Sequence, residues 1–192
     1  DGSHPITLEA FVTPHSRDRA GAIVGDHWAH GVNLGFWHND RWTMYAGRSA
    51  RALDGGWTFS PNPIRLGERV HVAGVWTEEK VRLFIDGKQV STEIFKDEAY
   101  VKSLGHFALG AHPAGGAGFF DGTIDEVRIS RVVRYADDFS PSDRFTNDEH
   151  TLALYHFDEG SGDVLRDSSG NGHHGKIVGA KWVETDTGTV PE

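Results

Sequence analysis

The segment VHVAGVWTEEKVRLFIDG, residues 70–87, predicts a β-hairpin. Val70–Trp76 and Val81–Ile85 are short runs rich in β-branched and aromatic residues, and a polar stretch separates them. Asp86-Gly87 follows directly, and this dipeptide favours a type I′ turn because both residues tolerate a positive φ. Since the pattern resumes at Lys88, we expect a further antiparallel strand after this turn.

Strand-like segments of the same kind recur on both sides of the hairpin. They cover residues 6–12, 22–25, 32–37, 42–45, 106–109, 122–129, 152–157 and 176–183. A spacing of roughly 8–12 residues between short strands is typical of a β-sandwich or jelly roll. The 24 glycines among 192 residues favour many tight turns over long helices. The sequence therefore predicts an all-β fold, a two-sheet antiparallel jelly-roll sandwich.

Three expectations concern the second half of the chain. Residues 140–143, SPSD, place a proline after a serine N-cap, which predicts one helical turn. Because two predicted strands follow residue 150, we expect the last strands to pair with early ones in a Greek key. We assign residues 1–183 to a single domain and residues 184–192 to a polar C-terminal tail.

Charge and composition exclude several function classes. The formal net charge is −9, whereas nucleic-acid binding requires a basic face. We expect no membrane span, since no apolar stretch approaches the ~18 residues that a span needs. The absence of cysteine excludes disulfides and thiolate zinc sites. The chain starts at Asp1 with no signal peptide, so we expect a processed module, a monomer attached to other domains.

Four segments resemble the laminin-G-like, concanavalin A-like lectin/glucanase family of jelly-roll domains, which includes bacterial members. They are residues 6–14, the VRLFIDG of residues 81–87, the FDGTIDEVRI of residues 120–129, and YHFDEGSG (155–162) with DSSGNGHHG (167–175). The resemblance implies a concanavalin A-like jelly roll, frequent carbohydrate binding and, in many members, a calcium ion. It also implies an extracellular or cell-surface location.

The position of the last of these segments differs from most of the family. FDEGSG and DSSGNG usually open the domain, but here they close it. We interpret this as a permuted variant rather than the start of a neighbouring domain, because the front of the chain lacks the strands that this segment supplies.

A calcium site is predicted at residues 167–172, DSSGNG. Side-chain oxygens occupy positions 1, 3 and 5 of this loop with glycine at position 6, as in the first half of a calcium-binding loop. Position 12 is Val178 rather than glutamate, so carboxylates elsewhere must complete the site; Glu159 is one candidate. The predicted ligands are Asp125, Asp158, Asp167 and Asn171. The alternative is a simple β-turn at Asn171-Gly172, capped by Asp167.

A ligand-binding face is predicted from aromatic residues next to polar ones. Sugar sites combine flat apolar rings with side chains that hydrogen-bond to hydroxyl groups. The predicted face comprises Asp26, His27, Trp28, Trp37, Asn39 and Trp57. In the alternative interpretation, Trp37 and Trp42 alternate inward and belong to the core.

Catalysis is not predicted. Glycoside hydrolysis needs two facing carboxylates, but Asp125 and Glu126 are adjacent in one strand and are expected on opposite faces. Glu9 stands alone on its strand. We therefore predict a non-catalytic carbohydrate-binding module with a structural Ca²⁺ ion and a polysaccharide or glycan partner. The alternative is a protein-contact, adhesion or spacer domain without sugar binding.

Overall fold

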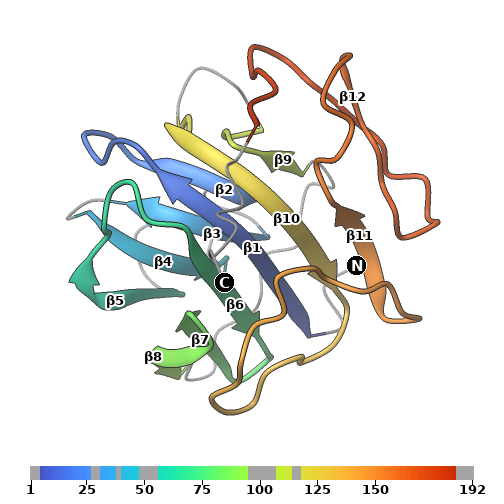
Figure 1. Ribbon diagram of the computed structural model, residues 1–192. Helices are drawn as coiled ribbons and strands as arrows, with labels where there is room; N and C mark the ends of the chain where they lie inside the picture. Colours follow the sequence, from blue (N-terminus) through green and yellow to red (C-terminus); the bar gives the residue numbers. More distant parts are fainter. Residues whose placement is uncertain are drawn as a thin grey trace, which may run out of the picture.

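The computed structural model describes residues 5–26, 31–37, 40–47, 56–94, 107–113 and 118–184. These residues form two antiparallel sheets and one small hairpin, with no helix among them. In Figure 1, β4 and β5 lie on one side of the sandwich, and β11 and β12 lie on the opposite side. The predicted all-β, two-sheet sandwich is confirmed.

The first sheet, sheet A, has the strand order β11-β10-β1-β6-β7-β8. Its strands are β1 (Ile6–Pro14), β6 (Val70–Trp76), β7 (Lys80–Ile85), β8 (Lys88–Ile94), β10 (Gly122–Ser130) and β11 (Thr151–Tyr155). The second sheet, sheet B, has the order β5-β4-β3-β2-β9. Its strands are β2 (Gly21–Gly25), β3 (Val32–Trp37), β4 (Arg41–Ala46), β5 (Trp57–Pro63) and β9 (Ala108–Leu109). The hairpin pairs β12 (Val164–Leu165) with β13 (Gly175–Lys176).

The main core lies between the two sheets, because alternate residues of each strand point inward. Leu8, Ala10 and Val12 of β1 belong to the same buried cluster as Leu34 and Phe36 of β3. Trp42 and Trp76 also lie in this cluster and are 4% and 1% exposed. Among the described residues, no helix has the length and apolar character needed to cross a membrane.

The outer face of sheet A is covered as well, by residues 131–147, which we call the covering segment. Tyr135 and Phe139 of this segment pack on Phe84, and Phe145 packs on Phe11. The predicted helical turn at residues 140–143 is wrong, because this stretch has no helical structure. Instead, Phe139 donates its backbone N–H to the carbonyl oxygen of Gly87 at 2.8 Å, so the chain lies against that turn.

The Asp86-Gly87 turn and the end of the chain give two further outcomes. Asp86 and Gly87 have φ values of 48° and 73°, as the predicted type I′ turn requires.

β11 pairs with β10, with Val127 opposite Tyr155, and it is β10 that pairs with β1. The expectation that the last strands pair with early ones is therefore wrong. Residues 176–183 contribute only Lys176 to a strand, and residues 185–192 lie outside the described residues.

Candidate functional site

The outer face of sheet B carries aromatic side chains. Leu34 and Phe36 of β3 point into the core, so Trp37 points outward. In β4, the inward positions are Trp42, Met44 and Ala46, which leaves Arg41, Thr43 and Tyr45 on the outer face. The interpretation of Trp42 as a core residue agrees with the structure, whereas Trp37 lies on the other face of the sheet.

Four rings on this face form what we call the aromatic cluster: Trp37, Tyr45, Trp57 and Phe59. The centroid of the Trp57 ring lies 4.5 Å from that of Tyr45 and 5.9 Å from those of Trp37 and Phe59. The planes of Trp57 and Phe59 differ by only 11°. Tyr45 is buried, and the other three rings are partly exposed. The cluster therefore combines a fixed base with accessible ring surface.

The predicted site residue Asp26 lies next to a core residue and not on this outer face, since its backbone N–H donates to the carbonyl of Val32 at 2.8 Å. It directly follows β2, is fully buried, and its carbonyl oxygen accepts a hydrogen bond from the Asn33 side chain at 3.3 Å. Asn33 is opposite Tyr45, and Tyr45 is opposite Trp57. Gly25 is the residue opposite Asn33, so the row that runs across four strands to the aromatic cluster begins at Gly25 and does not include Asp26.

The predicted ligand face is thus described in part. The structure brings Trp37 and Trp57 into contact, while His27, Trp28 and Asn39 lie outside the described residues. The sequence analysis missed Tyr45 and Phe59. Phe59 follows Trp57 by two residues, which is the spacing of side chains on one face of a strand. The two prolines and the asparagine of residues 61–63 nevertheless disfavour a strand assignment for β5.

The DSSGNG loop is organised by the Asp167 carboxylate. One oxygen accepts the backbone N–H groups of Leu154 and Ser169 at 3.0 and 2.9 Å. The other accepts the Ser169 hydroxyl at 2.8 Å and the His173 N–H at 2.9 Å. Burial raises the pKa of Asp167, but these hydrogen bonds outweigh it and the pKa is lowered overall. Asp167 thus caps the loop, as the alternative interpretation expects.

The same loop covers the open edge of β11. The Ser168 N–H donates to the Leu154 carbonyl at 2.7 Å, and the Asn171 amide donates to the carbonyls of Thr151 and Leu152, each at 3.0 Å. Edge strands otherwise expose unpaired backbone groups to solvent and to other chains. β11 is an edge strand of sheet A among the described residues, and the loop therefore satisfies this edge with the Asn171 and Asp167 side chains and one backbone N–H.

The other two predicted calcium ligands pair with arginines. Asp158 lies 2.6 Å from Nη2 of Arg144, and Asp125 lies 3.3 Å from Nη2 of Arg69. The hydrogen bond from Arg144 lowers the pKa of Asp158. Within the described part of the chain, no three His, Asp or Glu side chains gather as a metal-holding group. The four predicted ligands do not converge in this arrangement, and calcium binding stays a prediction.

A β-bulge in β10 changes the direction of Glu126. Glu126 has a φ of 46°, and the register shifts there between Val127 and Asp125. Its carboxylate accepts the Phe145 N–H at 3.0 Å, while Asp125 pairs with Arg69, whose guanidinium lies over the ring of Phe11. Phe11 and Phe145 stack on each other. Both carboxylates therefore reach the same face, and the expectation of opposite faces is wrong.

Glu9 is the single acid of β1, as the sequence analysis states, and it lies in a buried network of other polar side chains. Its carboxylate lies 2.8 Å from Nε of Arg128, 3.2 Å from Nε2 of His71 and 2.7 Å from the Tyr135 hydroxyl, which donates to it. Glu9 and His71 are fully buried beneath the covering segment. Burial raises the pKa of Glu9, but His71 and Arg128 outweigh it, so the pKa is lowered. This network stabilises the sheet interior and offers no access to a substrate.

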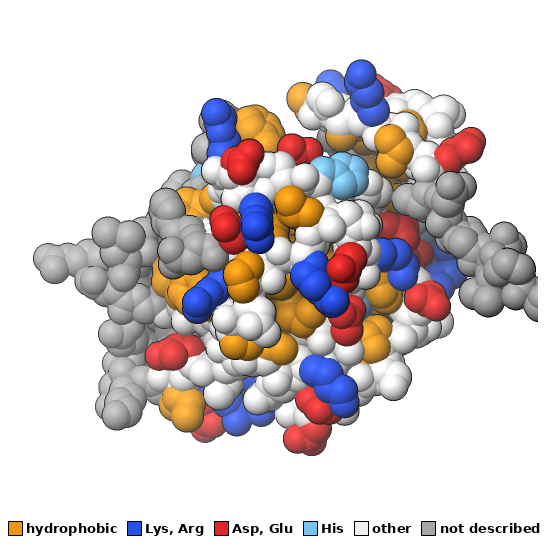
Figure 2. Space-filling view, turned by 60° about the vertical axis from the view of Figure 1, so that its left-hand side comes forward, with side chains coloured by type: hydrophobic (Ala, Val, Ile, Leu, Met, Phe, Trp, Pro, Cys, Tyr) orange, Lys and Arg blue, Asp and Glu red, His pale blue; other side chains and the backbone are white. Residues whose placement is uncertain are grey.

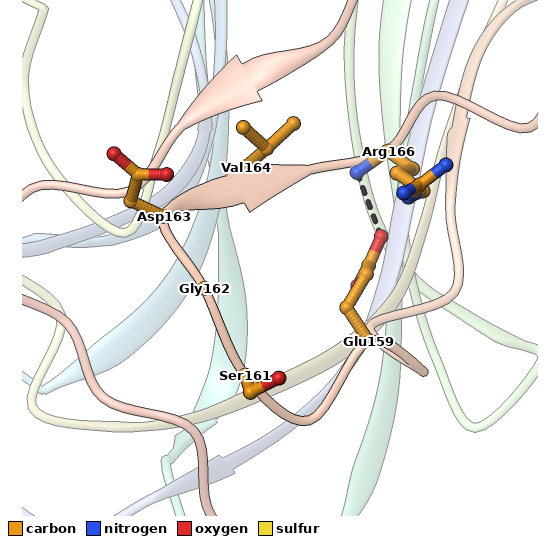
Figure 3. A pocket seen from close by; sticks show the side chains of 6 residues that line it. All are labelled: Glu159, Ser161, Gly162, Asp163, Val164 and Arg166. Carbon is orange, nitrogen blue, oxygen red and sulfur yellow. Dashed lines mark hydrogen bonds between the residues drawn. The ribbon is translucent and has the colours of Figure 1, made fainter.

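Two polar hollows lie beside the tail loops. One, of about 370 Å³, is lined by Glu159, Ser161, Asp163 and Arg166, among others (Figure 3). There the Glu159 carboxylate accepts the backbone N–H of Arg166 at 2.7 Å, while the Asp163 carboxylate lies apart. The other, of about 590 Å³, lies between the residue 147–151 segment and the DSSGNG loop. Among the described residues that line the two hollows, the one aromatic ring is that of His173.

The surface charge is mixed on the face that Figure 2 shows. Acidic and basic side chains lie next to one another there, with hydrophobic groups between them. Close pairing of opposite charges is also found at Arg134, whose guanidinium binds both oxygens of Asp148 at 2.8 and 2.7 Å. The hydrogen bonds from Arg134 hold the pKa of Asp148 well below its ordinary value. This face offers no continuous basic surface for a polyanion.

Comparison with known proteins places the fold. Three solved structures are similar: a candidate carbohydrate-binding protein of Bacteroides ovatus (TM-score 0.71, 18% identity), a carbohydrate-binding module (CBM40) of a Ruminococcus gnavus sialidase bound to α2,3-sialyllactose (0.56, 15%), and a pentraxin of Limulus polyphemus (0.52, 14%). They cover 88%, 69% and 69% of this chain. In the other direction, this chain covers 51% of the Bacteroides protein, which is about half of its length. It covers 78% of the Ruminococcus module and 66% of the pentraxin. No curated protein matches significantly.

The sequence profile of one family matches residues 1–139. That family is Laminin_G_3, of the concanavalin A-like lectin/glucanases superfamily. The match ends within the covering segment, before β11, so the single domain over residues 1–183 stays a prediction. The match covers well over half of the sequence and agrees with the observed sandwich, so the chain belongs to the Laminin_G_3 family of concanavalin A-like domains.

Proposed function

We propose that this protein is a non-catalytic carbohydrate-binding module that binds a glycan on the aromatic cluster of sheet B. The observation that carries the proposal is the cluster itself, in which three rings, those of Trp37, Trp57 and Phe59, are partly exposed on the face opposite the core. The C–H faces of a sugar pack on such rings, whose flat apolar surfaces lose water at little entropic cost.

The similar structures support the same class of ligand. The Ruminococcus module is bound to a sialylated sugar, and the Bacteroides protein is a candidate carbohydrate-binding protein. The Bacteroides chain is about twice as long as the part matched here, which fits a module joined to further domains. We infer an extracellular or cell-surface role within a larger protein.

The carboxylates support a binding rather than a catalytic role. A glycosidase needs two carboxyl groups free to reach the substrate. In the described residues, Glu9 is buried against Arg128, and Asp125 and Glu126 are paired with neighbouring groups. The strands of sheet B contain no acidic residue. No pair of acids therefore faces the aromatic cluster from the sheet.

The test is a glycan array followed by calorimetry with the best binder. We expect Trp57→Ala to weaken binding at least tenfold, because it removes the central ring, with the melting temperature showing that the variant is folded. Trp182→Phe is the matched control, since Trp182 lies in the tail and donates to the carbonyl of Gly162. Silence of the folded protein across the array would overturn the proposal and favour the adhesion or spacer role.

A further inference from the structure

Sheet B carries a single charged residue. Its five strands, all within the described residues, contain no Asp, Glu or Lys, and Arg41 at the start of β4 is their one arginine. This is unusual in a chain of net charge −9 with 24% charged residues. The charge also lies on the outer face, because the inward positions of β4 are Trp42, Met44 and Ala46.

Arg41 lies next to the aromatic cluster. It is directly opposite Trp37 in the β3–β4 pair, and residues opposite each other on one face have Cβ atoms about 4.5–5.5 Å apart. The long side chain of Arg41 therefore reaches the Trp37 end of the cluster, whose rings extend from there to Trp57 at 5.9 Å.

The guanidinium of Arg41 is exposed and has no ion pair or hydrogen bond with any described residue. Arg128, Arg134 and Arg144 each bind an acid, namely Glu9, Asp148 and Asp158, whereas the exposed Arg166 of the tail, like Arg41, has no such side-chain partner among the described residues. Within the described part of the chain, Arg41 therefore keeps its hydrogen-bonding capacity for a group from outside.

The nearest acids along the chain do not neutralise this charge. Asp40 precedes Arg41, but its carboxylate faces Arg17 at 3.8 Å. Asp26 is fully buried and lies beside Val32, at the other end of β3 from Trp37. A negatively charged ligand on the Trp37 end thus meets the Arg41 guanidinium without an acidic neighbour from the sheet.

We propose that Arg41 makes the aromatic cluster selective for glycans that carry a carboxylate, such as those with uronic or sialic acid residues. This inference rests on the proposed function. The planar guanidinium donates two parallel N–H groups to the two oxygens of a carboxylate, while the adjacent rings pack on the sugar. One arginine provides recognition at a fixed point and not the broad basic field that a sulfated polymer or nucleic acid requires.

The experiment compares acidic oligosaccharides with their methyl esters, which are neutral and nearly the same shape. Oligogalacturonate, oligoglucuronate and sialyllactose are titrated into the full chain by calorimetry, each beside its ester. We expect at least one acid to bind about tenfold more tightly than its ester, with the difference shrinking at high salt. Arg41→Gln should abolish the difference and leave the affinity for the ester unchanged. Arg41→Lys should retain part of the preference for the acid, since lysine keeps the positive charge but lacks the two parallel N–H donors of the guanidinium.

Arg166→Gln is the matched control, because Arg166 is an exposed tail residue of which only the backbone N–H is used. It should leave the preference for the acid intact. Equal binding of acid and ester by the unaltered protein, or a preference that survives Arg41→Gln, would overturn the role of Arg41 while glycan binding stands. Preference for sulfated over carboxylated sugars would overturn the ligand class. If no sugar binds the folded protein, the proposed function itself fails.

Discussion

The carboxylate of Asp167 accepts the backbone N–H of Leu154 at 3.0 Å, so a side chain of the tail loop replaces a neighbouring strand at the edge of β11. We predict that Asp167→Ala lowers the free energy of unfolding by about 2–3 kcal/mol, because buried N–H groups lose their acceptor. Urea denaturation measures this change. Asp163→Ala, which removes an exposed carboxylate in the same tail, should change stability by less than about 0.5 kcal/mol.

The stabilisation by Asp167 should depend on pH. Its folded-state pKa is lowered from the ordinary value of 3.8, since the hydrogen bonds outweigh burial. A lowered pKa contributes stability that is present above about pH 4 and is lost as the pH falls through the folded-state value. The difference in the free energy of unfolding between the original protein and Asp167→Asn should therefore be smaller at pH 3 than at pH 7. Denaturation at the two pH values measures it. A difference that grows as the pH falls would contradict the stabilising role of the ionised Asp167 carboxylate.

The hydrogen-exchange rate of one amide tests the edge arrangement more locally. The Leu154 N–H binds Asp167, so it should exchange much faster in Asp167→Ala than in the original protein. The Phe11 amide, in a strand with neighbours on both sides, is the internal reference. Equal acceleration of both amides would indicate global destabilisation instead of an opened edge.

Alternation and turn chemistry predict much of this fold. Val70–Trp76 is predicted and observed with the same bounds, because each of its residues is buried between the core and the covering segment. β5 was missed, since its Pro61 and Pro63 oppose a strand assignment in the sequence. The bulge at Glu126 was also missed: its left-handed φ of 46° has no glycine to mark it.

The candidate site was less predictable than the fold. Trp37 and Trp57 were selected by residue type, but their contact depends on the register of β3, β4 and β5. The exposed guanidinium of Arg41 has no sequence signal, because its role depends on which acids lie elsewhere. Arg128 shows the reverse case, since tertiary packing buries it against Glu9, far away in sequence.

The buried pair of Glu9 and Arg128 should show strong coupling. Arg128→Met alone leaves a carboxylate buried without its cation, and we predict a loss of about 3–5 kcal/mol. Glu9→Leu combined with Arg128→Met should cost less than the sum of the single changes, because neither charge is then buried alone. Urea denaturation of all four proteins in a double-mutant cycle measures the difference. Additivity within about 0.5 kcal/mol would show that the two side chains act independently.

Gly87 should be intolerant of a side chain. Its φ is 73°, and a Cβ atom there would collide with the backbone carbonyl of Phe139 in the covering segment. We predict that Gly87→Ala destabilises the protein by more than about 1 kcal/mol, as a thermal melt would show. Gly170→Ala is the control. Gly170 has a similar φ of 86°, but apart from its own chain neighbours no residue lies within 4 Å of the place that a Cβ would take, so only the backbone cost applies.

Calcium binding at the predicted ligands Asp125, Asp158, Asp167 and Asn171 is tested by thermal unfolding. If the ion is structural, EDTA should lower the melting temperature, and added calcium should restore it. Magnesium, which prefers a smaller octahedral site, is the control for general ionic effects. Identical melting with EDTA and with calcium would exclude a structural ion.

The central position of β1 has a consequence for synthesis. β1 pairs with β6 through Trp76 on one side and with β10 through Ser130 on the other. β1 is synthesised before β6 and β10, so its apolar residues stay unpaired until both strands have left the ribosome. Pairings between strands so distant in sequence also form slowly. A nascent chain that stops before residue 122 therefore carries a half-built sheet with β1 open at one edge.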